Sequence, residues 1–140
     1  MSYSLALPYP ISANLYWRTA VRAGRVHTYV SAEATAYKRT VQSICRQSGI
    51  TKPIAGRVKI TFTLHPALPQ NWHKRAEQNP ETWDNTVRCI DLDNAQKVLF
   101  DALKNVAFED DLMVWEISAK RGKPLESAAL FVMIESILLR

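Results

Sequence analysis

The sequence predicts a single mixed α/β domain, of the α+β type, built from one mixed β-sheet and two principal helices. Three observations favour this fold class. Period-two hydrophobic alternation predicts half-buried strands, apolar residues at helical spacing predict two long helices, and the two patterns alternate along the chain. A length of 140 residues suffices for one hydrophobic core. We therefore expect one domain over residues 1–140, with a long loop, functional or mobile, at about 66–88.

Strands and a turn open the chain. The run YSLALPYP is extended and ends at two prolines. Residues 12–31 contain two short strand-like pieces on either side of an Ala-Gly pair, which predicts a β-hairpin. Ser31 is a good N-cap, and apolar residues at helical spacing continue from there until Gly49. This first long helix is predicted to be amphipathic with a basic outer face.

The second half repeats the strand and helix patterns. RVKITFTLHPAL alternates as a half-buried strand, and residues 66–88 carry three prolines and many polar residues. Loops of that length in a compact domain are usually functional or mobile, so we interpret 66–88 as a loop or a partly helical excursion. A helix over roughly 93–107 follows. LMVWEISAKRG predicts a strand, and SAALFVMIESIL a closing strand that is apolar on both faces and hence central or covered.

The composition limits the classes of partner. The formal net charge is +5, and so basic a small domain attracts polyanions, of which nucleic acid is the commonest. The alternative is that the excess of Lys and Arg only keeps the protein in solution. No apolar run is long enough to span a membrane and no signal peptide is visible, so we expect a cytoplasmic protein with no membrane partner. Cys45 and Cys89 show no metal or redox spacing and are expected to be reduced thiols.

Acidic residues gather at both ends of the second helix of this basic chain. Asp93 is predicted as its N-cap, with Lys97 on the same face one turn later. Asp91 precedes Asp93 by two residues in an extended segment, so the two carboxylates can point the same way. Asp110 and Asp111 follow the helix, and only packing of the next strand beside the first pair would bring them together.

Two interpretations of these acids stay open from the pattern alone. Converging carboxylates suit Mg²⁺ or Mn²⁺, which bind substrate phosphate and activate a water, while Lys97 would hold the phosphate or assist proton transfer. In the structural alternative, Asp93 caps the helix, Asp93 and Lys97 form an exposed ion pair, and the later acids lie in a solvated loop.

The run DLDNAQKVLFDAL resembles the signature of the RusA family of Holliday-junction resolvases. The runs LPYPISANLYWR, GRVHTYVSAEATAYKRTV and AFEDDLMV resemble other segments of that family, in the same order along the chain. The resemblance implies a homodimeric, Mg²⁺-dependent, structure-selective DNA endonuclease, from a bacterium or a phage, that nicks four-way junctions symmetrically. The two-fold symmetry of such a junction also favours a homodimer.

The resemblance also implies the site residues. Asp91, Asp93 and Asp111 would bind Mg²⁺, or Mn²⁺ in its place, and Lys97 would complete the catalytic set, with Asp110 as the rival third acid. The residues expected to contact DNA, from their charge or from the resemblance, are Asn14, Tyr16, Arg18, Arg25, Lys38, Lys74 and Arg75. Arg22 and His27 are further basic candidates in the hairpin. For Tyr16, stacking on unpaired bases competes with core packing.

Two departures from the family pattern are visible. The segment before Asp91 looks longer than in compact members, and Ile90 stands where a basic residue or proline is common. Two other functions remain open beside the resolvase: a non-catalytic module of the same fold that binds branched DNA, and a ribonuclease or less selective nuclease. Only an enzyme predicts that Asp91→Asn spares junction binding while it abolishes cleavage.

Overall fold

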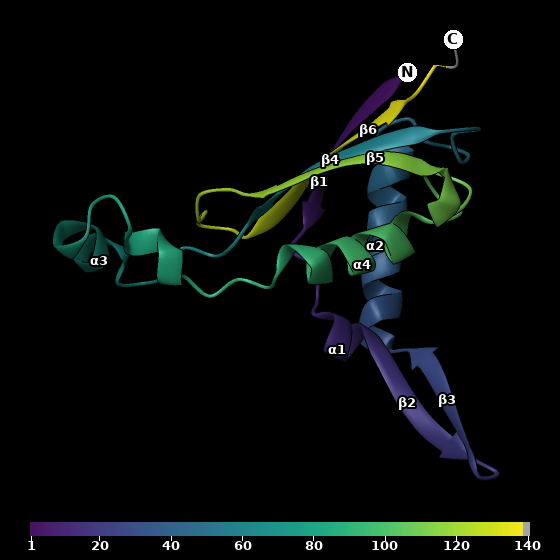
Figure 1. Cartoon of the computed structure of the whole chain (residues 1–140), viewed down its shortest axis with the longest axis horizontal. Helices are drawn as coiled ribbons and strands as arrows, with labels where there is room; N and C mark the ends of the chain where they lie inside the picture. Colours follow the sequence, from purple (N-terminus) through teal and green to yellow (C-terminus); the bar gives the residue numbers. More distant parts are fainter. Residues whose placement is uncertain (139–140) are drawn as a thin grey trace.

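The computed structural model describes residues 1–138 and contains a four-stranded sheet with its two long helices on one face (Figure 1). The strands lie in the order β1-β6-β4-β5. β4 and β5 are parallel and the other neighbouring pairs are antiparallel, which confirms the mixed sheet. The bounds of these elements are β1 Ser2–Pro8, α2 Ala32–Gln47, β4 Val58–His65, α4 Leu92–Leu103, β5 Val114–Arg121 and β6 Ala129–Ser136.

The core lies between the sheet and the two helices. Alternate residues of β4, from Val58 to Leu64, are buried, as the period-two pattern predicts. β6 is flanked by β1 and β4, so its predicted central place is confirmed. Its apolar residues nevertheless divide between two faces, because Phe131 and Met133 point away from the helices and are 43% and 40% exposed. None of the helices within residues 1–138 has the length and apolar content that crossing a bilayer requires.

The predicted hairpin is confirmed but forms a ribbon separate from the main sheet. A short helix, α1 (Ala13–Tyr16), leads into β2 (Trp17–Arg22), which pairs with β3 (Arg25–Val30). Figure 1 shows this ribbon projecting away from the domain beyond the end of α2. Ala23 and Gly24 both have positive φ, which is the requirement of the two-residue turn that matches the twist of paired strands.

Residues 66–88 form the partly helical excursion that the sequence allowed. They contain α3 (Trp72–Gln78) and a 3₁₀ helix, η1 (Trp83–Thr86). The rings of Trp72 and Trp83 lie 6.1 Å apart, so the excursion packs on itself. In Figure 1 it extends beyond the sheet on the side opposite the β4–α2 connection.

The second helix ends four residues earlier than predicted. α4 stops at Leu103, Lys104 is its C-cap, and Asn105 has a φ of 62°. Val106 and Ala107 continued the helical apolar spacing, and this misplaced the predicted end. Asn is one of the few residues other than glycine that tolerates the left-handed conformation with which helices commonly end.

Ser31 is expected to contribute measurably to stability. Its Oγ accepts from the Ala34 N–H at 3.2 Å and donates to the Leu15 carbonyl at 2.7 Å, so it caps α2 and ties α1 to it. We expect Ser31→Ala to lower the free energy of unfolding by about 1–2 kcal/mol, measured by urea denaturation. Ser43→Ala, at an exposed position of the same helix, is the control. Equal urea midpoints for the two variants would contradict the capping role.

Candidate active site

The carboxylates of Asp91 and Asp93 take part in neither structural role proposed for them. α4 begins at Leu92, so Asp91 and not Asp93 occupies the N-cap position, and the prediction for Asp93 was wrong by two residues. The Asp91 side chain accepts no capping hydrogen bond. Within residues 1–138 the ion pairs are Lys38–Asp101 and Lys104–Asp110, so Asp93 and Lys97 are not paired. All three side chains are exposed to solvent.

Two long-range hydrogen bonds hold the segment that carries these acids. The Ile90 N–H donates to the Tyr9 hydroxyl at 2.8 Å, and the Ala13 N–H donates to Asn94 Oδ1 at 2.7 Å. They lie just before Asp91 and just after Asp93, so the N-terminal segment fixes the backbone of the acidic pair from both sides. Tyr9 and Asn94 were missed as site residues. The signal that could have identified Tyr9 is its place between two prolines, which restrict the backbone around the ring.

The two groups of acids stay apart within one chain. α4 has twelve residues and is therefore about 18 Å long, with Asp91 at its start. Asp111 begins η2 (Asp111–Met113), beyond the other end of the helix. β5, which follows, pairs with β4 and not with the segment before α4. Among residues 1–138 no three His, Cys, Asp or Glu side chains are close enough to hold a metal ion. The convergence of the three acids does not occur in the single chain.

Asp110 and its neighbour Asp111 differ in what they contact. Asp110 Oδ1 accepts from the Leu112 N–H at 3.1 Å, and its Oδ2 lies 3.6 Å from Lys104 Nζ. The Leu112 N–H and then the Lys104 charge lower the pKa of Asp110 below its usual value. Asp110 therefore caps η2, whereas Asp111 is exposed and takes part in neither ion pair of residues 1–138. The contacts favour Asp111 over Asp110 as the third acid, and that assignment stays a prediction.

Two residues expected to contact DNA also take part in contacts within the protein. Tyr16 is fully buried, and its hydroxyl donates to the Asp101 carboxylate. Burial, and then the hydrogen bond to Asp101, raise the pKa of Tyr16 above its usual value. Lys38 Nζ lies 2.8 Å from Asp101 Oδ2, so this ammonium ties α2 to α4. The packing alternative is thus confirmed for Tyr16, and its stacking on DNA bases was a wrong expectation. The expected DNA contact of Lys38 stays a prediction, and a phosphate there would compete with Asp101 for the same ammonium.

A model of one protein family matches residues 8–135, and the description of that family is Endodeoxyribonuclease RusA. The chain belongs to the RusA family. A crossover junction endodeoxyribonuclease RusA of Escherichia coli O139:H28 (strain E24377A / ETEC) is 34% identical over 115 residues, which are 81% of this chain and 78% of that protein. The protein of the same name from strain K12 is 35% identical over 107 residues (76% and 71%), and that of Enterobacteria phage 82 is 34% identical over 107 residues (76% and 71%).

In this RusA-family chain the hairpin gathers basic side chains on one face. The register pairs Arg18 with Tyr29, Ala20 with His27 and Arg22 with Arg25, and alternate pairs share a face. Residues 21–29 are all exposed. The pairing thus places Arg18, Arg22, Arg25 and His27 on one face of the hairpin, where they form a basic stripe. Their spacing in the sequence did not reveal this common face.

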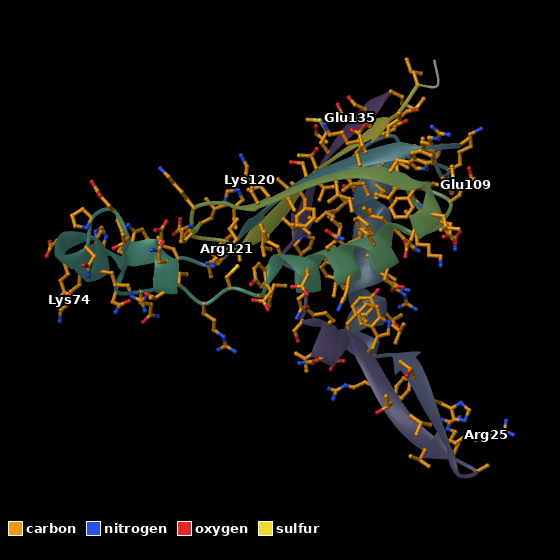
Figure 2. The ribbon with its side chains drawn as sticks, viewed as in Figure 1. Arg25, Lys74, Glu109, Lys120, Arg121 and Glu135 are labelled. Atoms are coloured by element: carbon orange, nitrogen blue, oxygen red, sulfur yellow. The ribbon has the colours of Figure 1, made fainter. Side chains whose placement is uncertain are left out.

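The remaining DNA-contact candidates lie apart from the hairpin. Asn14 is exposed on α1, Lys74 is exposed on α3, and Arg75 is half-buried beside it. Figure 2 places Arg25 on the hairpin and Lys74 on α3, at opposite ends of the view. Arg88 was missed as a candidate. It is exposed three residues before Asp91, on the segment that joins η1 to α4.

Proposed function

We propose that this member of the RusA family resolves Holliday junctions by paired symmetric nicks, through Mg²⁺-dependent hydrolysis of phosphodiester bonds in DNA recombination and repair. One observation carries the proposal: among residues 1–138 the Asp91 and Asp93 carboxylates form no ion pair and Asp91 accepts no capping hydrogen bond, while backbone-linked hydrogen bonds on both sides hold the pair at the start of α4. The printed names of the relatives, which are crossover junction endodeoxyribonucleases, support it.

The proposed chemistry assigns a role to each residue of this pair and its neighbour. Carboxylate oxygens are the ligands that hard divalent cations prefer, so Asp91 and Asp93 fit Mg²⁺, with Mn²⁺ as a substitute. Such an ion supplies an activated water and neutralises charge on the phosphate when it is bound. Lys97 lies on the same face of α4 one turn later, where its ammonium would bind the oxygens of the scissile phosphate.

The third acid is proposed to come from a second copy of the chain. Asp91 and Asp111 belong to opposite ends of α4, and a two-fold axis that sets two such helices side by side would bring each start to the partner's far end. β5 is an edge strand of the sheet, and edge strands readily pair with another chain. Its apolar side chains support this interface: Leu112, just before it, is 83% exposed, Trp115 58% and Ile117 45%.

The basic stripe of the hairpin is proposed to bind phosphates of the junction arms. We expect Arg25→Gln to weaken junction binding. The slope of the logarithm of the binding constant against the logarithm of the salt concentration should also become less steep by about one, since each phosphate contact releases counterions. Arg25 faces Arg22 across the hairpin, so its removal relieves a like-charge pair and should not unfold the ribbon. Lys52→Gln, an exposed cation between α2 and β4, is the control. Equal slopes for the two variants would show that Arg25 of the hairpin does not contact the DNA.

The proposal is tested by cleavage of a labelled synthetic four-way junction against a linear duplex of the same sequence. We expect symmetric nicks on the junction with Mg²⁺ and none with EDTA or on the duplex. Tight junction binding without cutting under any divalent ion would make the protein a non-catalytic binding module. Comparable cutting of the duplex or of RNA would make it a less selective nuclease.

We further propose that the protein acts in the cytoplasm of a bacterial cell, encoded by the cell or by a resident phage. The relatives from Escherichia coli strains and from a phage support this host range.

A further inference from the structure

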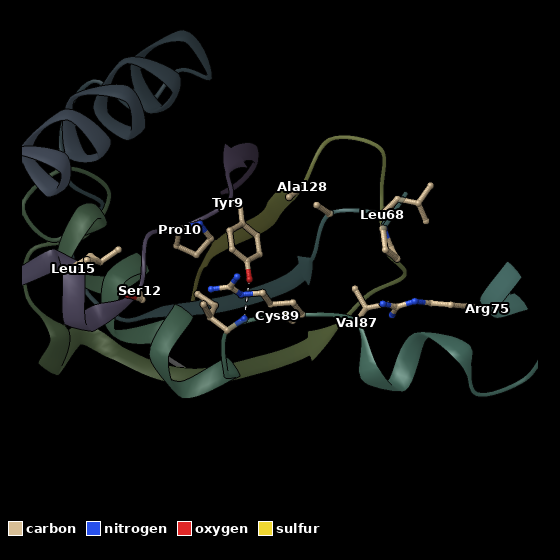
Figure 3. Close-up of a pocket in the computed structure, with 13 residues that line it drawn as sticks. Tyr9, Pro10, Ser12, Leu15, Leu68, Arg75, Val87, Cys89 and Ala128 are labelled. Carbon is tan, nitrogen blue, oxygen red and sulfur yellow. Dashed lines mark hydrogen bonds between the residues drawn. The ribbon is translucent and has the colours of Figure 1, made fainter. Parts of the chain in front are cut away.

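A cavity of about 520 Å³ is lined in part by the residues that directly precede Asp91 in the chain. One wall is the N-terminal segment with Tyr9 and Pro10, and the opposite wall is the loop after β4 with Leu68. Residues 87–90 form its floor and lead directly into Asp91. Figure 3 shows these walls facing one another, with Leu15 of α1 at one end and Arg75 of α3 at the other. A ligand in this cavity would contact the segment that leads into the proposed catalytic acids.

The Tyr9 ring is a fixed aromatic surface in this cavity. Its hydroxyl accepts the Ile90 N–H at 2.8 Å, which the dashed line in Figure 3 marks, and prolines precede and follow it in the chain. A ring that is held at both its backbone and its hydroxyl loses little conformational entropy when a flat ligand stacks on it. Most other lining side chains are apolar, as in sites that receive a planar ring.

The positive charge at the edge of the cavity favours a ligand with negatively charged groups on either side of its apolar part. Arg75 and Arg88 both line it, and Arg88 is exposed while Arg75 is half-buried. The two ion pairs of residues 1–138 leave both guanidinium groups free. A nucleotide within a DNA strand combines an apolar, flat base with a phosphate on either side. This is the combination that an apolar cavity edged by two guanidinium groups would recognise.

We infer that this cavity binds an unstacked nucleobase of the DNA strand next to the scissile phosphate, with the base against Tyr9 and the flanking phosphates near Arg75 and Arg88. Extruding a base from a duplex costs a few kcal/mol, and it costs least where the base is already unpaired. The cavity would then couple the choice of cut site to the base that it accepts. The inference rests on the proposed function for its substrate and adds a base-binding site to it.

The test combines a filled cavity with a missing base. Leu68→Trp places a large ring in the cavity, and a fixed four-way junction carries an abasic residue at either nucleotide that flanks the cut. For the wild-type protein we expect the abasic residue on one side to weaken junction binding and to slow cleavage on the order of tenfold, as the loss of one stacked base does. For Leu68→Trp we expect that abasic effect to disappear, since the cavity no longer holds a base.

A second variant and a control keep the outcomes distinct. Leu15→Trp fills the cavity from α1, at a side chain that is 50% exposed, and should reproduce the result if Leu68→Trp does not fold. Leu138→Trp, at a position that is 82% exposed, should retain the full abasic effect. Equal abasic effects in the wild type and in both filled variants would overturn the base-binding site while leaving junction cleavage intact. A wild-type protein that binds junctions without cutting them would overturn the proposed function, and the binding measurements would still decide for or against the cavity.

Discussion

Asp91→Asn is expected to abolish junction cleavage while junction binding is retained or tightened. The substitution replaces a carboxylate oxygen that would bind the metal, and a loss of about 4 kcal/mol of transition-state stabilisation corresponds to about a thousandfold slower cleavage. Binding should not fall, because removing a negative charge near a phosphate reduces repulsion. Folding should be little affected, since the Asp91 side chain makes no capping hydrogen bond. Single-turnover cleavage and gel-shift titration of the same labelled junction measure the two effects.

Glu33→Gln is the matched control for this prediction. Glu33 is an exposed acid in the first turn of α2, as Asp93 is in α4, and it lies far from Asp91 in the chain. We expect this variant to cut at the wild-type rate. Mg²⁺-dependent nicking that survives Asp91→Asn within a fewfold of the wild type would show that Asp91 is not a metal ligand, whatever the result for Glu33.

Mixed dimers of Asp91→Asn and Asp111→Asn chains are expected to regain cleavage that each variant lacks alone. If each site takes Asp91 from one chain and Asp111 from the other, a mixed dimer contains one site with both substitutions and one site with none. Half of the dimers in an equal mixture are mixed, so about a quarter of the wild-type number of intact sites should return. The products should be single nicks and not paired ones. Co-expressed chains with two different tags allow the mixed species to be purified and assayed.

A site formed within a single chain predicts that the mixed dimers stay inactive. A site built within one chain would carry one substitution in each half of the mixed dimer, and no cleavage would return. Asp110→Asn is the control partner, because the hydrogen bond from Leu112 and the charge of Lys104 already engage Asp110. Paired with Asp91→Asn, it should behave as a wild-type chain carrying Asp111. Failure of Asp111→Asn to lose activity on its own would return Asp110 to consideration as the third acid.

The sequence predicted correctly those elements that depend on residues close to one another in the chain. The alternation along β4, the Ser31 cap of α2 and the Ala23-Gly24 turn depend only on neighbouring residues, and all three are confirmed. The end of α4 was misplaced because the apolar spacing continued past Asn105, where the backbone turns left-handed. Whether a hairpin joins the main sheet depends on long-range packing, so the separate ribbon was not visible in the sequence.

In the candidate site, too, the residues that are close in sequence were predicted and those that act over long range were missed. Asp91, Asp93 and Lys97 lie within seven positions of one another, so their common place at the start of a helix followed from spacing alone. Tyr9 and Asn94 act across 81 residues each, and no local pattern reports such contacts. The separation of Asp111 from Asp91 follows from the topology of the chain. β4 and β5 are parallel neighbours joined through α4, and a helix in such a crossover runs opposite to its strands, so residues before and after it lie at opposite ends.

The separation of the acids along α4 has a consequence for when such a protein can damage DNA. Under the shared-site proposal, an isolated chain holds only part of a cutting centre, so a newly synthesised subunit is harmless until it meets another. At protein concentrations well below the dimer dissociation constant, the cutting rate should then rise with the square of the concentration. A modest increase in expression would produce a much larger increase in nuclease activity, and dilution would switch the protein off without any inhibitor.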